Sequence, residues 1–215
     1  MNPEIGILKK ELEIADDSQI LEILEELSDI YYTSDLDLSV DYARQGLEMA
    51  KTMGDEDKQT IFYLNLLTGL NRLVRREEFE AVLEDAKEFA KVAPPQNQVK
   101  LLNQFSIFCL MQKKPLDAIP ILDEALKIQE KIDYPKAKVS LLINYGIVYS
   151  DLYQLEKAAE ILYDALEIAE KENYEDFRMS ILVNLSNVFY KLNKMDKKME
   201  LLKDALAIGL MLTRK

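Results

Sequence analysis

Four carboxamide side chains recur along this chain at almost constant intervals. They are Asn65, Gln104, Asn144 and Asn184, and the intervals are 39, 40 and 40 residues. A carboxamide carries both a donor and an acceptor, so a row of them could hydrogen-bond the main chain of an extended peptide. The alternative interpretation is that the same amides bond between adjacent helices or to nearby carbonyl groups.

The residues that most enzymes need for catalysis are missing or isolated. There is no histidine to act as a base and only one cysteine, and no Gly-rich phosphate loop or G-x-S-x-G elbow occurs. Glu77, Glu78 and Glu80 stand at the start of an expected helix, where acidic side chains favour the helix dipole. We therefore predict no catalytic residues, no metal site and no cofactor.

Composition limits the fold and the partners. Hydrophobic residues make up 48% of the 215 residues, and only six Gly and six Pro occur, which favours an all-α fold with a continuous core. A net charge of −12 argues against nucleic acid or an anionic membrane as the main partner. A single cysteine and no recognisable signal or membrane-spanning segment favour a cytoplasmic location.

The amides are positioned by a longer repeat of apolar and small residues. Leu142, Gly146, Ala158, Leu162 and Ala165 form one copy, and positions 40 residues earlier and later carry similar side chains. The earlier copy is Leu102, Ser106, Ala118, Leu122 and Ala125, and the later one is Leu182, Ser186, Lys198, Leu202 and Ala205. A fixed period of this size at helical spacing is typical of stacked helical hairpins.

Breaks in the apolar pattern predict eleven helices. Residues 1–17 form a short helix or cap, and residues 18–215 form five antiparallel hairpins. The predicted hairpins are 18–53, 57–91, 96–131, 135–172 and 175–212, and the repeat is least regular in the second of them.

Two segments carry a family resemblance. NYGIVYSDLYQLEKAAEILYDALEIA, residues 144–169, and NLSNVFYKLNKMDKKMELLKDALAI, residues 184–208, resemble tetratricopeptide repeats. The resemblance implies a right-handed superhelical solenoid of antiparallel helix hairpins. The period of about forty residues is longer than the thirty-four usual in that family, as in a variant found in bacterial regulatory proteins and motor light-chain-like adaptors.

The resemblance also implies where a ligand would bind. In that family, the first helices of the hairpins line the concave groove. An Asn at the position of the four recurring carboxamides often bonds the backbone of a bound peptide. The groove positions of this chain, besides the four amides, include Arg72, Lys100, Asn103, Ile107, Ile143, Ile147, Ser150, Asp151, Asn187, Tyr190 and Lys191. The basic clamp of chaperone-tail adaptors is missing, so we expect a non-catalytic scaffold or adaptor for an extended or helical segment with apolar anchors.

The last predicted helix suggests a second surface. Its sequence, ELLKDALAIGLMLTRK, crowds apolar residues at its end: Leu206, Ile208, Leu210, Met211 and Leu212. This pattern predicts a homodimer contact, a docking site for a partner, or a chain that continues in a longer parent protein. Packing on the preceding helix accounts for some of these residues. Two alternatives to the scaffold follow: a sensor or regulatory segment of a larger signalling protein, and a self-assembling structural module.

Overall fold

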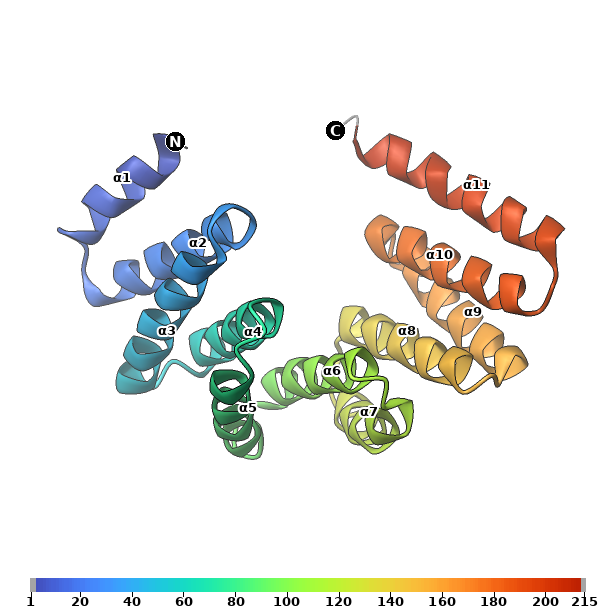
Figure 1. The fold of residues 1–215 in the computed structure, drawn as a ribbon, viewed down its shortest axis with the longest axis horizontal. Helices are drawn as coiled ribbons and strands as arrows, with labels where there is room; N and C mark the ends of the chain where they lie inside the picture. Colours follow the sequence, from blue (N-terminus) through green and yellow to red (C-terminus); the bar gives the residue numbers. More distant parts are fainter. Residues whose placement is uncertain (1–2, 214–215) are drawn as a thin grey trace. The chain divides into compact units, whose positions relative to one another are not determined.

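The computed structural model describes residues 3–213, and within them it contains eleven α-helices and no strand (Figure 1). Contacts between residues cluster into two compact units, the first ending at Asn97 and the second beginning at Gln98. The boundary falls near the start of α6, Pro95–Met111. The two units are described separately below.

The first unit consists mainly of five helices. Their bounds are α1 Pro3–Leu12, α2 Asp17–Ser34, α3 Leu36–Met53, α4 Glu56–Arg72 and α5 Arg76–Ala90. Asp16 begins α2 with a capping box, in which its Oδ1 accepts from the Gln19 backbone N–H at 2.9 Å and Gln19 Oε1 accepts from the Asp16 N–H at 3.1 Å. Asp35 and Asp55 cap α3 and α4 through their side chains.

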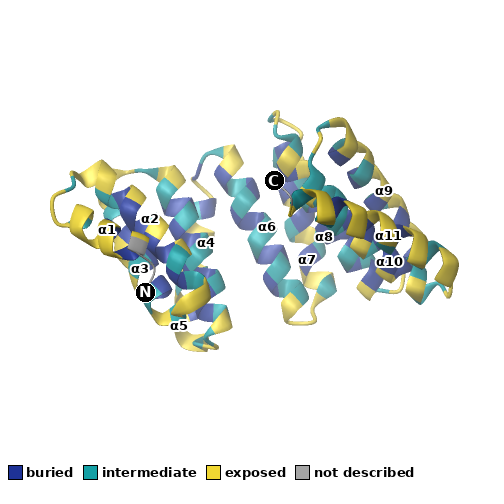
Figure 2. Ribbon diagram, turned by 90° about the horizontal axis from the view of Figure 1, so that it is seen from above, coloured by how far each residue is buried: buried dark blue, intermediate teal, exposed yellow. Residues whose placement is uncertain are grey.

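The second unit holds most of α6 and five further helices. Their bounds are α7 Pro115–Gln129, α8 Pro135–Asp151, α9 Leu155–Lys171, α10 Glu175–Lys191 and α11 Met195–Leu212. Pro115 and Pro135 occupy the first helical position, where a missing N–H leaves no hydrogen bond unmade. Successive helices α8 to α11 pack as neighbours, and their facing sides are buried (Figure 2).

Several helices end in the same kind of turn, with a left-handed residue two positions after the helix. These residues are Val74, Lys113, Tyr153, Asn173 and Asn193, with φ between 58° and 60°. After α4, the Val74 N–H donates to the Asn71 carbonyl at 3.2 Å and the Arg75 N–H to the Leu70 carbonyl at 3.1 Å. This pair of bonds is the Schellman motif, which satisfies helix carbonyls and reverses the chain.

Small side chains allow α8 and α9 to approach closely. A Cβ added at Gly146 would lie 2.5 Å from Cγ of Leu162, which is itself fully buried. Ala158 and Ala165 flank Leu162 on α9 and are also fully buried. The repeated small residues therefore set the spacing between the two helices of this hairpin and fix the position of the α8 surface that faces away from it.

None of the helices described is long and apolar enough to cross a membrane. The same residues contain no cluster of three or more His, Cys, Asp or Glu side chains that could hold a metal ion.

Candidate functional site

Two of the four recurring carboxamides, Asn65, Gln104, Asn144 and Asn184, bond to a neighbouring helix; we call these four the ladder amides. Asn65 on α4 donates to Asp29 Oδ1 on α2 at 3.0 Å and lies 3.4 Å from Ser28 Oγ. Asn144 on α8 is buried and donates through Nδ2 to Asn103 Oδ1 on α6 at 2.8 Å. At these two positions the contacts match the interpretation of bonds between adjacent helices.

The other two ladder amides lie in different surroundings. Asn184 donates to the carbonyl of Ser180, one turn earlier in α10, at 2.9 Å, which leaves its side-chain oxygen as an acceptor. Gln104 on α6 is half-buried. Equal spacing in the sequence therefore does not give equal hydrogen bonding, because the partner side chains differ from one repeat to the next.

A cleft between α8 and α10 brings seven of the expected groove residues together. We call it the α8–α10 cleft, and its volume is about 420 Å³. The expected residues that line it are Ile147, Ser150, Asp151, Asn184, Asn187, Tyr190 and Lys191. Gly146 and Leu162 form part of its floor, so the close approach of α8 and α9 helps to shape it.

Lys191 is held firmly at one end of the cleft. Its Nζ donates to the backbone carbonyl and to Oγ of Ser150, both at 3.0 Å, and lies 3.5 Å from Asp151 Oδ1. These contacts direct the ammonium group from α10 onto the end of α8. The nearby carboxylate offsets much of its charge, so this end of the cleft is polar and only weakly cationic.

The remaining cleft residues present both apolar and polar groups to the surface. Ile147 is half-buried against the core, whereas Asn187 is exposed. Tyr190 is 54% exposed, and Lys198 Nζ lies 4.2 Å from the centre of its ring. An aromatic ring, an amide and an aliphatic side chain in one cleft suit a peptide, whose backbone and side chains need both kinds of contact.

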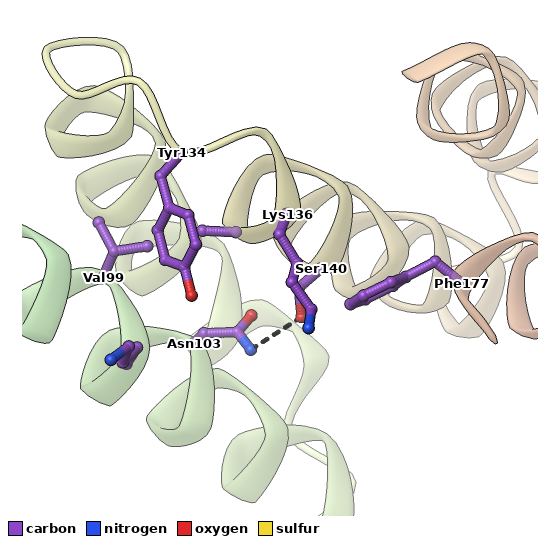
Figure 3. A pocket seen from close by; sticks show the side chains of 8 residues that line it. Val99, Asn103, Tyr134, Lys136, Ser140 and Phe177 are labelled. Carbon is purple, nitrogen blue, oxygen red and sulfur yellow. Dashed lines mark hydrogen bonds between the residues drawn. The ribbon is translucent and has the colours of Figure 1, made fainter. Parts of the chain in front are cut away.

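The other expected groove residues lie outside this cleft. Arg72, in the first unit, donates to the Tyr32 carbonyl at 3.2 Å and stacks over the Tyr32 ring. Ile143 is buried, and Ile107 is half-buried. Lys100 and Asn103 line a smaller pocket between α6 and α8 (Figure 3).

The apolar end of α11 is divided between core and surface. Ile208 is buried and Leu212 packs against the core of the second unit, so these two residues do not form part of an exposed docking surface. Leu206, Leu210 and Met211 are each more than half exposed. The structure adds Met195 and Met199, which are about half exposed on the same helix. Met199 precedes Leu206 by seven residues and Leu210 by eleven, about two and three helical turns.

The titratable side chains with altered pKa values pair with helix neighbours. Burial, together with a hydrogen bond to Asp85 Oδ2 at 2.7 Å, raises the pKa of Tyr63. Burial and a hydrogen bond to Asp123 raise the pKa of Tyr145 in the same way. Tyr63 joins α4 to α5, the two helices of one hairpin, whereas Tyr145 joins α8 to α7, the second helix of the preceding hairpin. Neither tyrosine lines the α8–α10 cleft.

Helical hairpins that stack in this way define a helical-repeat fold. No protein-family model matches the sequence, and no curated protein is similar enough to match it. Solved structures do match. BtubC (BKLC) from P. vanneervenii has a TM-score of 0.73 and 17% identity, with 97% of this chain and 88% of that chain covered.

Two further structures indicate the same fold. The TPR-like repeats of a putative kinesin light chain from Podosopora anserina give a TM-score of 0.67 at 18% identity, covering 91% of this chain and 97% of that one. Aspartyl phosphate phosphatase F from Bacillus subtilis gives 0.68 at 15% identity, covering 94% of this chain and 63% of that chain. The chain therefore has a tetratricopeptide-like, all-α repeat fold.

Proposed function

We propose that this protein is a non-catalytic binding module that holds a short segment of a protein or peptide partner in the α8–α10 cleft. The observation that carries the proposal is the convergence of Ile147, Asn184, Asn187, Tyr190 and Lys191 around one open cleft from two separate helices. Peptide recognition needs a rigid support of this kind, and regular helices provide it.

The individual groups suggest how the segment would be held. Asn187 is exposed and the Asn184 oxygen is free to accept, so the pair offers donors and acceptors to a peptide backbone. Tyr190 and Ile147 would contact an apolar side chain of the ligand. A chain of the same fold, NprR, has been solved in complex with its cognate peptide NprX, with a TM-score of 0.66 at 16% identity, which agrees with this use of the scaffold.

The test is selection of ligands from a displayed library of random peptides, followed by measurement of Kd for a selected peptide. Asn187→Ala and Tyr190→Ala should each weaken binding by about tenfold, the effect of losing a good interface contact. Lys203→Ala provides the control, because Lys203 is exposed on α11 and does not line the cleft. Equal affinity for all three variants would contradict the proposal.

A second candidate function rests on α11. Its exposed apolar residues, Met195, Met199, Leu206, Leu210 and Met211, favour association with a second copy or with another protein over an ordinary solvated helix face. Sedimentation velocity over a range of concentrations distinguishes these cases. A dimer that Leu206→Glu with Leu210→Glu converts to a monomer would support self-association, whereas a wild-type monomer at every concentration would exclude it.

A further inference from the structure

A groove with a volume of about 390 Å³ is lined by side chains from α9, α10 and α11. We call it the α9–α11 groove, and the lining residues that decide its chemistry are Tyr163, Leu182, Leu201, Asp204, Ala207 and Ile208. None of its lining residues belongs to the α8–α10 cleft or to the exposed apolar set on α11. An inference about this groove therefore rests on neither of the functions proposed above.

The floor of the α9–α11 groove is aliphatic. Leu182 from α10 and Leu201 and Ile208 from α11 are all buried. Tyr163 lines the groove from α9 and is 40% exposed, and its ring meets the Phe189 ring edge-on with 6.5 Å between the ring centroids. The volume falls within the roughly 300–1,000 Å³ of ordinary ligand sites. The groove therefore has room and apolar surface for at least one aliphatic side chain of a ligand.

The charged groups around this floor leave one carboxylate unpaired. Arg178 donates to both carboxylate oxygens of Glu175, at 2.7 and 2.8 Å, and Lys197 donates to Glu200 at 2.8 Å. Within residues 3–213, Asp204 lies in no ion pair, and its charge acts on Lys197 only at a distance. Because the two cations of the groove are bound by other carboxylates, Asp204 is available to a cationic group of a ligand.

The preceding repeat has a different surface at the equivalent positions. Forty residues before Tyr163 and Ala207 the sequence carries Asp123 and Glu167, which are both acidic. Asp123 accepts a hydrogen bond from the Tyr145 hydroxyl group. The α9–α11 groove thus has an aromatic ring and a methyl group where the earlier repeat has two charged side chains. This exchange makes the groove more apolar, which favours contact with a ligand over contact with water.

The combination of groups selects the kind of cation. A guanidinium group can donate two hydrogen bonds to one carboxylate and can stack on an aromatic ring, whereas an ammonium group acts as a point charge. Asp204 and Tyr163 offer these two contacts, and the aliphatic floor requires an apolar neighbour. The net charge of −12 also attracts a basic segment. We infer that the α9–α11 groove binds a short segment of another protein in which an arginine stands beside an aliphatic residue.

The probe is the peptide acetyl-Leu-Arg-Arg-Leu-amide. It places each leucine next to one arginine and two positions from the other, and its blocked ends carry no terminal charge. Titration followed by ¹H–¹⁵N NMR should give saturable shifts for the amides of Leu182, Leu201 and Asp204. A peptide with citrulline in place of arginine has the same shape without the charge, and acetyl-Ala-Arg-Arg-Ala-amide lacks the aliphatic groups. Each should bind about tenfold more weakly.

Three single variants test the residues. Asp204→Asn should weaken binding of the arginine peptide by about tenfold, and Ala207→Arg, which places a cation in the groove, by at least as much. Asp164→Asn is the matched control, because Asp164 is exposed at the same position of the preceding repeat and does not line the groove. It removes the same charge and should leave the affinity unchanged. The helical circular dichroism of each variant checks that the chain still folds.

Several results would overturn the inference. These are the absence of saturable shifts at peptide concentrations up to about 10 mM, equal affinity for the arginine and citrulline peptides, and an equal loss of affinity in Asp164→Asn. The last would indicate attraction to the overall negative charge of the chain. Tighter binding of the lysine counterpart would contradict the assignment to arginine.

Two further outcomes would assign the peptide or the groove differently. Shifts confined to residues of the α8–α10 cleft would place the peptide at the site proposed above and not in the α9–α11 groove. Sedimentation velocity tests for a second copy of the chain as the occupant. A wild-type dimer that Asp204→Asn dissociates would assign the groove to self-association and overturn the inference of a foreign partner, whereas an unchanged sedimentation coefficient with saturable peptide binding supports it.

Discussion

Asparagine side chains serve different purposes in this protein because their burial differs. Asn144 is 6% exposed and bonds across to another helix, whereas Asn187, three residues beyond Asn184 on α10, is exposed. A buried amide that loses its partner leaves a polar group without water, and an exposed amide does not. Burial therefore separates structural amides from those that are available to a ligand.

This difference predicts unequal effects on stability. Asn144→Ala should lower the free energy of unfolding by about 1–2 kcal/mol, because Asn103 Oδ1 loses its donor in a partly buried setting. Asn187→Ala should change it by less than about 0.5 kcal/mol, as is usual at the surface. Urea denaturation followed by circular dichroism measures both. Equal effects would mean that the contact between Asn144 and Asn103 contributes nothing.

Asp85 predicts a dependence of stability on pH. Partial burial favours its neutral form, but hydrogen bonds from Lys51 and Tyr63 outweigh this and hold the pKa of Asp85 below its usual value of 3.8. A carboxyl whose pKa is lower in the folded state contributes stability above its unfolded pKa, and that contribution is lost as the pH falls through the folded value. The unfolding free energy should therefore fall with acidification below about pH 4.

The variant Asp85→Asn isolates this contribution. It should be less stable than the wild type at pH 7, and the difference should shrink at low pH, where the wild-type carboxyl is protonated. The comparison is between the urea midpoints of Asp85→Asn and the wild type, measured at pH 7 and again at a pH low enough to protonate the wild-type Asp85 carboxyl. The exposed Glu124→Gln serves as control and should show no such convergence. A difference for Asp85→Asn that is constant with pH would contradict the explanation.

At the scale of the helices, the turn after α4 contains a residue poorly suited to it. Val74 is branched at Cβ, has φ of 58° and is 78% exposed. The left-handed conformation costs an ordinary L-residue about 1–2 kcal/mol, and Asn tolerates it better. The equivalent positions after α9 and α10 already carry Asn173 and Asn193. The Schellman hydrogen bonds hold Val74 in this conformation despite its cost.

Val74→Asn should therefore stabilise the protein by about 1 kcal/mol, because the side chain makes no buried contact that the substitution would remove. The reciprocal variant Asn193→Val should destabilise it by a similar amount. Thermal unfolding monitored by circular dichroism measures both changes. If Val74→Asn lowered the melting temperature, the backbone of this turn would not be strained by valine.

Close packing of α8 on α9 leads to a further prediction. Gly146→Ala should lower the unfolding free energy by about 1–3 kcal/mol, because its Cβ would overlap Leu162, a fully buried side chain. The control is Gly6→Ala on α1, where an added Cβ meets nothing within 4 Å and should stabilise by about 0.5–1 kcal/mol. In a double-mutant cycle, Leu162→Ala should offset part of the cost of Gly146→Ala.

The helices were predictable from the sequence for a physical reason that does not extend to the hydrogen bonds. Helix formation depends on apolar periodicity and local signals such as Pro135 and Asp16, which are present in the sequence itself. The partner of Asn144, in contrast, lies 41 residues away and depends on how two helices pack. The same limit applies to the α11 surface, where burial of Ile208 follows from packing on the core of the second unit.

The smaller pocket between α6 and α8, which Tyr134, Lys136 and Phe177 also line, illustrates the same limit of prediction from sequence. Lys100 and Asn103 were expected at a binding groove from their repeat positions, but Tyr134, Lys136 and Phe177 were not. Tyr134 and Lys136 lie at the start of α8 and Phe177 near the start of α10, outside the stretch that carries the repeated pattern. These three residues lie near equivalent positions, the starts of first helices in successive hairpins, and this shared position in the repeat is the sequence signal that predicts their proximity.

At the scale of the whole molecule, contacts cluster within two units, and the α8–α10 cleft, the α9–α11 groove and the smaller pocket all belong to the second. Stability in helical-repeat proteins is approximately a sum over repeats and their nearest neighbours, so a local substitution has its largest effect near its own position. Binding residues in the second unit should therefore depend mainly on packing in that unit, and substitutions in the first unit should leave them largely unaffected.

Hydrogen exchange measured by mass spectrometry on peptic peptides, in mild denaturant, tests this division. Gly146→Ala should accelerate exchange in peptides from residues 98–213 by about tenfold or more, the equivalent of at least 1.4 kcal/mol, and should change those from residues 3–97 much less. Gly46→Ala should have the opposite pattern, because its added Cβ would overlap the ring of Phe62 in the first unit. Equal acceleration of both sets of peptides by either variant would indicate one cooperative unit, since opening of either part would then require opening of the whole chain.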